Sequence, residues 1–363
     1  MNIPVLHHFK TAVSEAHTQD HKMAASQTDR PTDDHHHHHK INEAIAAASP
    51  WTQRDVNWSS VCYQVFIHAG ALVGASCVPS AAWPTLAWAF ALLFLSELGI
   101  TGGVHRLWSH RSYTAALPFR IFLALCAQVA NQGSIYHWVR DHRVHHLCSE
   151  TEADPHNASQ GFFFAHIGWL LVKKTGAVHA KGRTVDMSDI DADPVAYLDK
   201  ILFPWSNLLM CFVAAPAVAV YGWGESMYTA CMVCGFLRYC LGLHHTWAVN
   251  SFAHLFGDHP YDANINPAEN WFVSILANGE GWHNYHHAYP YDYSASEHGW
   301  TVQYNPTTFV IDMAANLGMV SNRKKATKAW EGRKARKAAG AAGHHHHHHH
   351  HHPSQQNGHT KAA

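Results

Sequence analysis

The sequence predicts an all-α integral membrane protein: four transmembrane helices in two hairpins, with a cytosolic helical cap that carries a two-metal site. Three observations predict it. Only 14% of the 363 residues are Asp, Glu, Lys or Arg, against about 25% in ordinary soluble proteins. Four apolar segments of membrane-spanning length come in two closely linked pairs. Clusters of histidine lie outside these segments, where a polar cap would form.

The four segments each contain at most one charged residue, Glu97 in the second and Arg238 in the fourth. As helices they would be roughly 26–32 Å long, close to the thickness of the bilayer hydrocarbon. The alternative is buried core helices of a soluble protein, but pairing across very short links favours two membrane hairpins. The predicted spans are 61–78, 85–101, 203–223 and 227–243.

The distribution of positive charge indicates how these spans are oriented. The two links, 79–84 and 224–226, contain no Lys or Arg, and 24 of the 25 Lys and Arg residues lie before the first hairpin, in 102–200 or after 243. An even number of spans puts these three regions on one face, with both termini. By the positive-inside rule that face is cytosolic. The net charge of −1 indicates no nucleic-acid partner.

The polar ends divide the chain into three parts. Residues 1–50 are predicted to be a disordered N-terminal region, 51–320 the membrane domain, and 321–363 a disordered, basic, His-rich tail. His runs at 35–39 and 344–352 account for 14 of the 37 His. We interpret them as low-complexity tracts or a purification tag, because a flexible tract holds no fixed coordination geometry.

Three further histidine clusters have the spacing of metal ligands. They are HRLWSH (105–110), HRVHH (142–146) and HNYHH (283–287). In the second and third, the His fall at i, i+3 and i+4, which share one helix face, and neutral imidazole is the commonest metal ligand. His105 and His110 lie about 140° apart on an ideal helix. They therefore need a helix end or a local distortion to converge.

His254 completes the set, and Asn250, four residues earlier, would share its helix face. Nine His exceed the four ligands of one zinc ion, so we expect two metal ions with room left for water or oxygen. Imidazole suits iron, copper, zinc and nickel alike, and the residues alone leave the metal open. A metal transporter is the remote alternative, because clusters on one face offer no path across the membrane.

Over residues 57–320 the chain resembles the animal-type membrane acyl-CoA desaturases, the family typified by stearoyl-CoA (Δ9) desaturases. The stretches that carry the resemblance are GITGGVHRLWSHRSY (99–113), YHWVRDHRVHHLCSETEADPHN (136–157), GFFFAHIGWLLVKK (161–174) and NINPAENWFVSILANGEGWHNYHHAYPYDY (264–293).

The resemblance implies an O2-dependent oxidoreductase of the endoplasmic reticulum membrane, with two non-haem iron ions. It would insert a cis double bond at Δ9 of a saturated fatty acyl-CoA, with electrons from cytochrome b5 and its NADH-dependent reductase. A C–H bond deep in an alkyl chain offers no handle for acid–base chemistry, so an oxidising metal centre suits this reaction. The implied ligands are His105, His110, His142, His145, His146, His254, His283, His286 and His287, with Asn250 acting through a water.

The resemblance also implies a tunnel for the acyl chain and a basic surface for its CoA. The matching tunnel positions are Gln132, Trp138, Thr246 and Trp247, with Glu97 where the family has a small residue that helps to set tunnel depth. A Trp beside a span is otherwise a membrane-interface anchor. The expected CoA contacts are Arg140, Lys173, Lys174, Lys181 and Arg183, although the lysines equally suit a solvated face.

The alternative within the same fold is a di-iron lipid hydroxylase or a desaturase of different regiochemistry. Histidine spacing does not separate these reactions, because the outcome depends on how the substrate is held.

Overall fold

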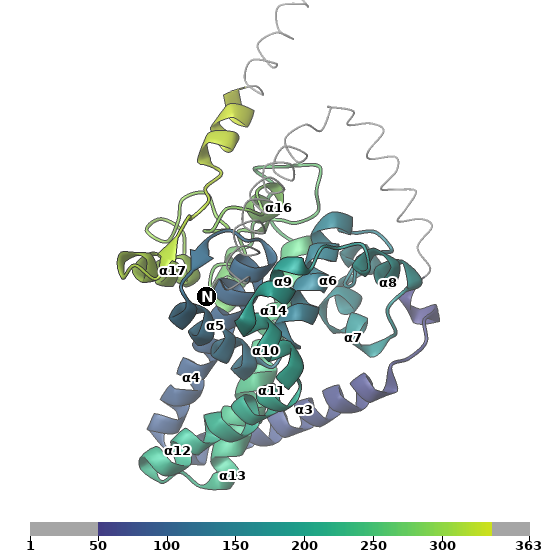
Figure 1. The fold of residues 1–363 in the computed structure, drawn as a ribbon. Coiled ribbons are helices and arrows are strands. Elements are labelled where there is room, and N and C mark those ends of the chain that lie inside the picture. Colours follow the sequence, from purple (N-terminus) through teal and green to yellow (C-terminus); the bar gives the residue numbers. More distant parts are fainter. Residues whose placement is uncertain (1–49, 336–363) are drawn as a thin grey trace, which may run out of the picture. The chain divides into compact units, whose positions relative to one another are not determined.

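The computed structural model of the protein describes residues 50–335, and the expectations for 1–49 and 336–363 lie outside the described residues. The all-α prediction is confirmed: helices dominate the described part (Figure 1). Its two named strands, β1 (Thr114–Ala115) and β2 (Val320–Ser321), form one short antiparallel pair with Thr114 opposite Ser321.

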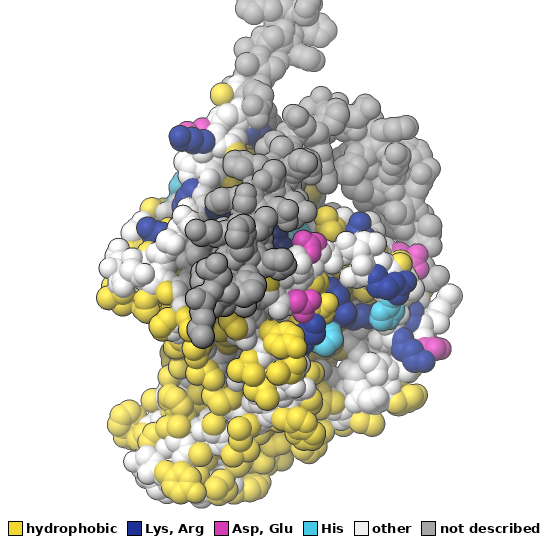
Figure 2. Space-filling view, in the orientation of Figure 1, with side chains coloured by type: hydrophobic (Ala, Val, Ile, Leu, Met, Phe, Trp, Pro, Cys, Tyr) yellow, Lys and Arg dark blue, Asp and Glu magenta, His cyan; other side chains and the backbone are white. Residues whose placement is uncertain are grey.

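Three helical stretches in the described part are long and apolar enough to cross a membrane: Trp58–Ser80, Trp83–Ser109 and Trp205–Trp223. They match the first three predicted spans. The first comprises α3 (Trp58–Cys77) and η2 (Val78–Ser80), and the second α4 (Trp83–Leu98) and the π-helix η3 (Gly99–Ser109); the third comprises α11 (Trp205–Leu209), η6 (Met210–Ala214) and α12 (Ala215–Trp223). Figure 2 shows hydrophobic side chains covering the surface around these helices, as a lipid environment requires.

The fourth predicted span, 227–243, lies in a continuous helical stretch but is not among these three. The stretch comprises α13 (Met227–Ala230), η7 (Cys231–Leu237) and α14 (Arg238–Leu255). Arg238 and His244 lower its mean hydropathy, and the helix continues past the predicted end into the cap. Arg238 is buried and donates to the backbone oxygens of Cys234, Val129 and Cys211 at 3.0, 2.9 and 3.4 Å. These bonds satisfy a charge that would otherwise be costly at this depth.

The two hairpin links meet at one end of the bundle. Glu225, in the link 224–226, accepts hydrogen bonds from the Ala82 backbone N–H at 2.9 Å and the Thr85 hydroxyl at 2.6 Å. Trp223 also donates to Thr85, at 2.8 Å. The two Lys- and Arg-free links therefore lie on the same side, as two membrane hairpins would require.

The cap is formed by the helices between the hairpins and after the second one. Asp199 joins two of them, because its carboxylate accepts from the first N–H of α6 (Ile135) at 2.7 Å and from Gln128 of α5 at 3.2 Å. In Figure 1, α6 to α9 lie away from the α12–α13 link. The cap elements are α5 (Leu117–Ala130), α6 (Ile135–Cys148), η4 (Ala158–Gln160), η5 (Phe164–Gly168), α7 (Trp169–Leu171), α8 (Gly176–Gly182), α9 (Ser188–Ala192), α10 (Pro194–Leu202), α15 (Trp271–Leu276), α16 (His283–Ala288) and α17 (Pro306–Asn316); η1 (Trp51–Gln53) precedes α3.

The described part of the predicted tail, 321–335, packs against the cap. Ala326 is buried, and the Trp330 ring lies 4.8 Å from that of Tyr261 while its N–H donates to Glu297 at 2.8 Å. Arg333 pairs with Asp262 at 3.0 Å. The Trp330 side chain and the Arg333–Asp262 ion pair thus hold residues beyond the predicted boundary at 320 against the cap.

Candidate metal centre and substrate cavity

A π-helix brings the first pair of histidines together. In η3 the turn is widened, and the backbone N–H of His110 bonds to the carbonyl of His105, five residues earlier, at 3.1 Å. The two rings consequently lie with their centroids 4.8 Å apart. The sequence predicted that this pair needs a helix end or a local distortion to converge, and the structure has both, because η3 is a π-helix that ends at Ser109, just before His110.

Five histidines form the first group of candidate metal ligands. His286 of α16 stands at its centre: its Nε2 lies 3.0 Å from the Nε2 of His105 and 3.0 Å from that of His146. His110 and His142 approach each other at 2.8 Å, again between Nε2 atoms. The group consists of His105, His110, His142, His146 and His286.

The other four histidines form the second group, and one atom of each lies within 4.8 Å of the rest. His283 of α16 is central, with its Nε2 3.0 Å from the Nε2 of His254 and 3.2 Å from that of His287. The rings of His146 and His287 stack at 4.3 Å and connect the groups. The second group consists of His145, His254, His283 and His287. All nine predicted histidines therefore converge.

Three buried carboxylates contact the Nδ1 atoms of histidines in these groups. His145 donates its Nδ1–H to Asp154 at 3.0 Å, and His254 donates to Glu150 at 2.7 Å. The Nδ1 of His105 lies 3.0 Å from Glu280. A hydrogen bond at Nδ1 fixes the tautomer and turns the Nε2 lone pair toward the group. Sequence reasoning missed these carboxylates, although they lie in SETEAD (149–154) and NGEG (278–281), beside two of the histidine clusters.

Electrostatic effects keep histidines of the site uncharged, so that their lone pairs are able to bind a cation. Burial and the neighbouring rings hold the pKa values of His142, His146 and His286 well below their usual range. The same causes lower the pKa of His145 to about 3. Burial alone would raise the pKa of Glu280, but Arg106 and His105 reverse this and lower it. Neutral imidazoles with converging lone pairs, supported by carboxylates, form a donor set that fits two transition-metal ions.

A cavity of about 340 Å³ reaches the histidines, and is lined by His105, His142, His145 and His283 among others. Its size lies within the usual range for ligand sites. Trp138 stacks on His142 at 4.8 Å, and Gln132 donates to Thr246 at 2.7 Å. The predicted tunnel residues that line this cavity are Glu97, Gln132, Trp138, Thr246 and Trp247, together with Asn250.

Glu97 lies in the wall of this cavity with Ile100 and Thr101. Its side chain is 2% exposed, and its Oε1 lies 3.9 Å from Nδ1 of His245. Within the part of the chain that the structure describes, its Oε2 has no hydrogen-bond partner. It is therefore a bulky polar group in a largely apolar wall.

The structure gathers only some of the predicted CoA contacts. Arg140 and Lys174 both pair with Asp141, which lines the cavity. Lys181 and Arg183 flank Gly182, which packs against Arg140: a Cβ at Gly182 would lie 3.6 Å from the Arg140 side chain. Lys173 departs from this group because it pairs with Asp55 at 3.1 Å and is largely exposed.

Comparison with known proteins agrees with this geometry. A family model described as fatty acid desaturase matches residues 80–296. The chain is 50% identical over 272 residues to a stearoyl-CoA desaturase of Homo sapiens, which covers 75% of each chain. It is 48% identical over 289 residues to stearoyl-CoA desaturase 5 of Bos taurus, or 79% of this chain and 86% of that one. The chain belongs to the fatty acid desaturase family.

Proposed function

We propose that this protein is an acyl-CoA desaturase that inserts a cis double bond at Δ9 of a saturated fatty acyl-CoA. The observation that carries the proposal is the convergence of nine histidines in two groups beside a substrate-sized cavity. The relatives named stearoyl-CoA desaturase, which are about 50% identical to this chain over the 272 to 289 aligned residues, support the substrate class. Residues 51–320 would form the catalytic membrane domain.

The proposed cofactor is a pair of iron ions, one held by each histidine group, with Asn250 adding a water-mediated contact to the four-histidine group. Bound iron would supply the oxidising power for C–H cleavage: O2, two electrons and two protons convert CH2–CH2 to CH=CH and two waters. Glu150, Asp154 and Glu280 would hold the ligands in place, since each contacts a histidine Nδ1.

The protein's own part in the reaction is to position the alkyl chain. Trp138 stacks on His142, so a carbon chain against the Trp138 face lies next to the metal ligands. Trp247 supplies a second aromatic wall, and the hydrogen-bonded Gln132 and Thr246 line the cavity between α14 and the end of α5. Holding the reacting carbons beside the centre contributes to the rate through orientation.

We further propose that electrons arrive from cytochrome b5 and its NADH-dependent reductase, and that the protein resides in the endoplasmic reticulum membrane with its termini and active site cytosolic. The shared end of the two hairpin links, free of Lys and Arg, supports this orientation.

Expression in desaturase-deficient cells tests the reaction. We expect restored growth and a cis-Δ9 monounsaturated product, identified by gas chromatography of derivatised fatty acids. A hydroxylated acyl chain as the main product would favour the hydroxylase alternative, and a shifted double bond the other regiochemistry. Elemental analysis of the purified protein should give at least one iron atom per chain more than a His283→Ala variant, because His283 lies in one of the two histidine groups and the variant retains the same His runs.

Glu97→Ala is expected to lengthen the preferred acyl chain, because removing this side chain from the wall enlarges the cavity. The space would open beside Gly242, which packs against Glu97: a Cβ added at Gly242 would lie 3.5 Å from the Glu97 side chain. The product profile from saturated acyl-CoAs that differ by two carbons measures the shift. Glu97→Gln keeps the volume and should keep the profile. An unchanged profile in the alanine variant would give Glu97 a structural role instead.

Arg140→Ala is expected to raise KM for acyl-CoA about tenfold with little change in kcat, since a charge-assisted hydrogen bond to phosphate contributes roughly 1.5–3 kcal/mol. Steady-state kinetics with the solubilised enzyme and its electron donors measure this. Lys173→Ala is the matched control, because Lys173 forms an ion pair with Asp55 and does not join the group around Arg140. Equal effects of the two substitutions would contradict the placement of CoA at Arg140.

A further inference from the structure

A second cluster of metal-ligating side chains lies outside the nine-histidine centre. His68 of α3 meets Cys240 and His244 of α14, and one ligand atom of each lies within 4.8 Å of the others. His68 and His244 are 176 residues apart in the chain, yet their Nε2 atoms are 3.1 Å apart. The mechanism described above uses none of these three residues.

A chain of hydrogen bonds fixes the tautomers of this cluster. At one end, Nδ1 of His68 donates to the backbone carbonyl of Gln64 at 2.7 Å, because a carbonyl can only accept. At the other end, the Ser251 hydroxyl donates to the Trp247 carbonyl at 2.9 Å. Ser251 therefore accepts from Nδ1 of His166 at 2.8 Å.

This series of hydrogen bonds is one hydrogen short. Neutral His166, with its hydrogen on Nδ1, offers a bare Nε2, which accepts from Nδ1 of His244 at 3.0 Å. Neutral His244 then has a bare Nε2, and so does His68. These five contacts require five hydrogens, whereas three neutral imidazoles and one hydroxyl supply four. Neutral imidazoles therefore leave no hydrogen between the two facing Nε2 lone pairs.

The same arrangement occurs in the nine-histidine centre. There too, Nε2 atoms face each other at 2.8–3.2 Å, and partners at Nδ1 turn ligands inward. In the second cluster, Gln64 and His166 are the Nδ1 partners of His68 and His244. Cys240 adds a buried sulfur ligand of a kind that the main centre does not contain.

We propose that His68, Cys240 and His244 bind one thiophilic transition-metal ion, Cu⁺ or Zn²⁺. Thiolate and imidazole ligands together select these metals over Mg²⁺ or Ca²⁺. The surroundings are apolar, with Ile67, Ala71 and Leu243 packed in the same cluster. A thiolate with Cu⁺ leaves no net charge and with Zn²⁺ one positive charge, and a low-dielectric setting tolerates both better than a bare divalent ion. The ion would join α3 to α14 beside the substrate cavity, which Leu243 and Trp247 line.

Cobalt titration of the full chain, purified in detergent with its main centre loaded, tests the site. Co²⁺ bound to a thiolate gives a charge-transfer absorption that neither the nine histidines nor the His runs can produce. We expect this absorption to saturate at one Co²⁺ per chain, and Zn²⁺ or Cu⁺ to displace it in the order of their affinities. His166→Ala should weaken binding about 10- to 100-fold, because His166 orients His244.

Substitutions of the three proposed ligands test whether they bind the metal ion. Cys240→Ser should abolish the absorption, and His68→Gln and His244→Asn should each weaken binding more than tenfold. Cys231→Ser, a change at a cysteine outside the cluster on the preceding helical turns, should behave like the unaltered chain. If Cys240→Ser does not fold, as judged by gel filtration and iron content, the two histidine variants carry the test. No thiolate absorption in the unaltered chain, or an undiminished one in Cys240→Ser, overturns the proposal and assigns the fifth hydrogen to a proton.

Discussion

Replacing His286 with alanine is expected to abolish desaturation while leaving the protein in the membrane. His286 is 1% exposed and its Nε2 contacts two other ligands at 3.0 Å, so its removal opens the centre of the five-histidine group. Altering residues that merely orient a ligand typically weakens metal binding 10- to 100-fold, and loss of a ligand should exceed that. Product analysis and the iron content of purified protein, measured on the same preparation, check the expectation.

His179→Ala is the matched control for this substitution. His179 lies on α8, is exposed, and belongs to neither histidine group. It should retain full activity and the iron content of the unaltered chain. Full activity in the His286 variant would contradict its assignment as a ligand, whereas loss of membrane insertion would show that the substitution had disrupted folding, and His142→Ala would then replace it.

Much of the candidate metal centre could be predicted, because sequence spacing alone places most of its histidines on shared helix faces. His142, His145 and His146 share a helix face by spacing, and so do His283, His286 and His287. His105 and His110 do not, and the sequence indicated only that they need a helix end or a local distortion to converge. The π-helix that satisfies this requirement is fixed by tertiary packing, since every residue of η3 is buried.

The carboxylates behind the ligands could not be predicted in the same way. Glu280 reaches His105 across 175 positions of sequence, and Glu150 reaches His254 across 104. No local spacing encodes such pairs. In a sequence, acidic residues of a loop also look like ordinary solvated groups. Only their burial beside the histidines of the folded protein reveals that they contact these histidines.

Prediction of the membrane spans from the sequence is limited in a related way. Counting charges predicted four spans of similar kind, but Arg238 makes the fourth different from the other three. Its guanidinium is satisfied by carbonyls of Val129 and Cys211, which lie on other helical stretches. Hydropathy treats that charge as a penalty, whereas the tertiary structure satisfies it.

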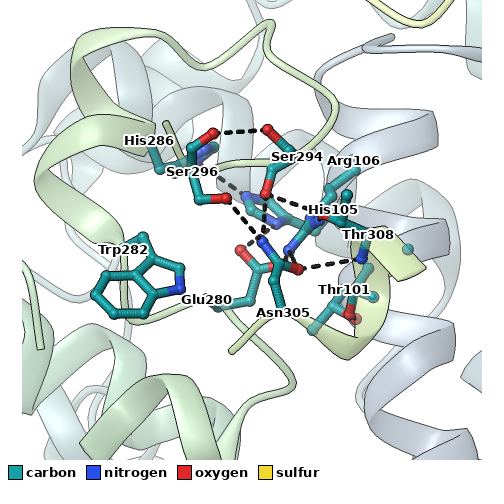
Figure 3. Close-up of polar contacts among 12 residues, drawn as sticks. Thr101, His105, Arg106, Glu280, Trp282, His286, Ser294, Ser296, Asn305 and Thr308 are labelled. Atoms are coloured by element: carbon teal, nitrogen blue, oxygen red, sulfur yellow. Dashed lines mark hydrogen bonds and ion pairs between the residues drawn. The ribbon is translucent and has the colours of Figure 1, made fainter. Parts of the chain in front are cut away.

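Arg106→Ala is expected to be strongly destabilising. Arg106 is 1% exposed, and its Nε and Nη2 contact one oxygen of Glu280 at 2.9 and 2.8 Å. It also donates to Thr308 at 2.9 Å and to Asn305 at 3.2 Å (Figure 3). A further hydrogen bond runs to the Tyr293 carbonyl at 3.2 Å. Removing it leaves a buried carboxylate without its cation, which costs about 3–5 kcal/mol. Thermal unfolding of the detergent-solubilised protein, followed by circular dichroism, measures the loss.

The double variant separates the ion pair from the packing of the arginine. Glu280→Gln alone should also destabilise, since it leaves Arg106 charged and unpaired. Arg106→Ala with Glu280→Gln removes both charges and should cost less than the two single changes added together. Iron content should fall in each variant that alters Glu280, because its other oxygen lies 3.0 Å from Nδ1 of His105 and orients that ligand. Strictly additive losses would mean that Arg106 stabilises the cap through Asn305, Thr308 and Tyr293 rather than through the carboxylate behind the metal centre.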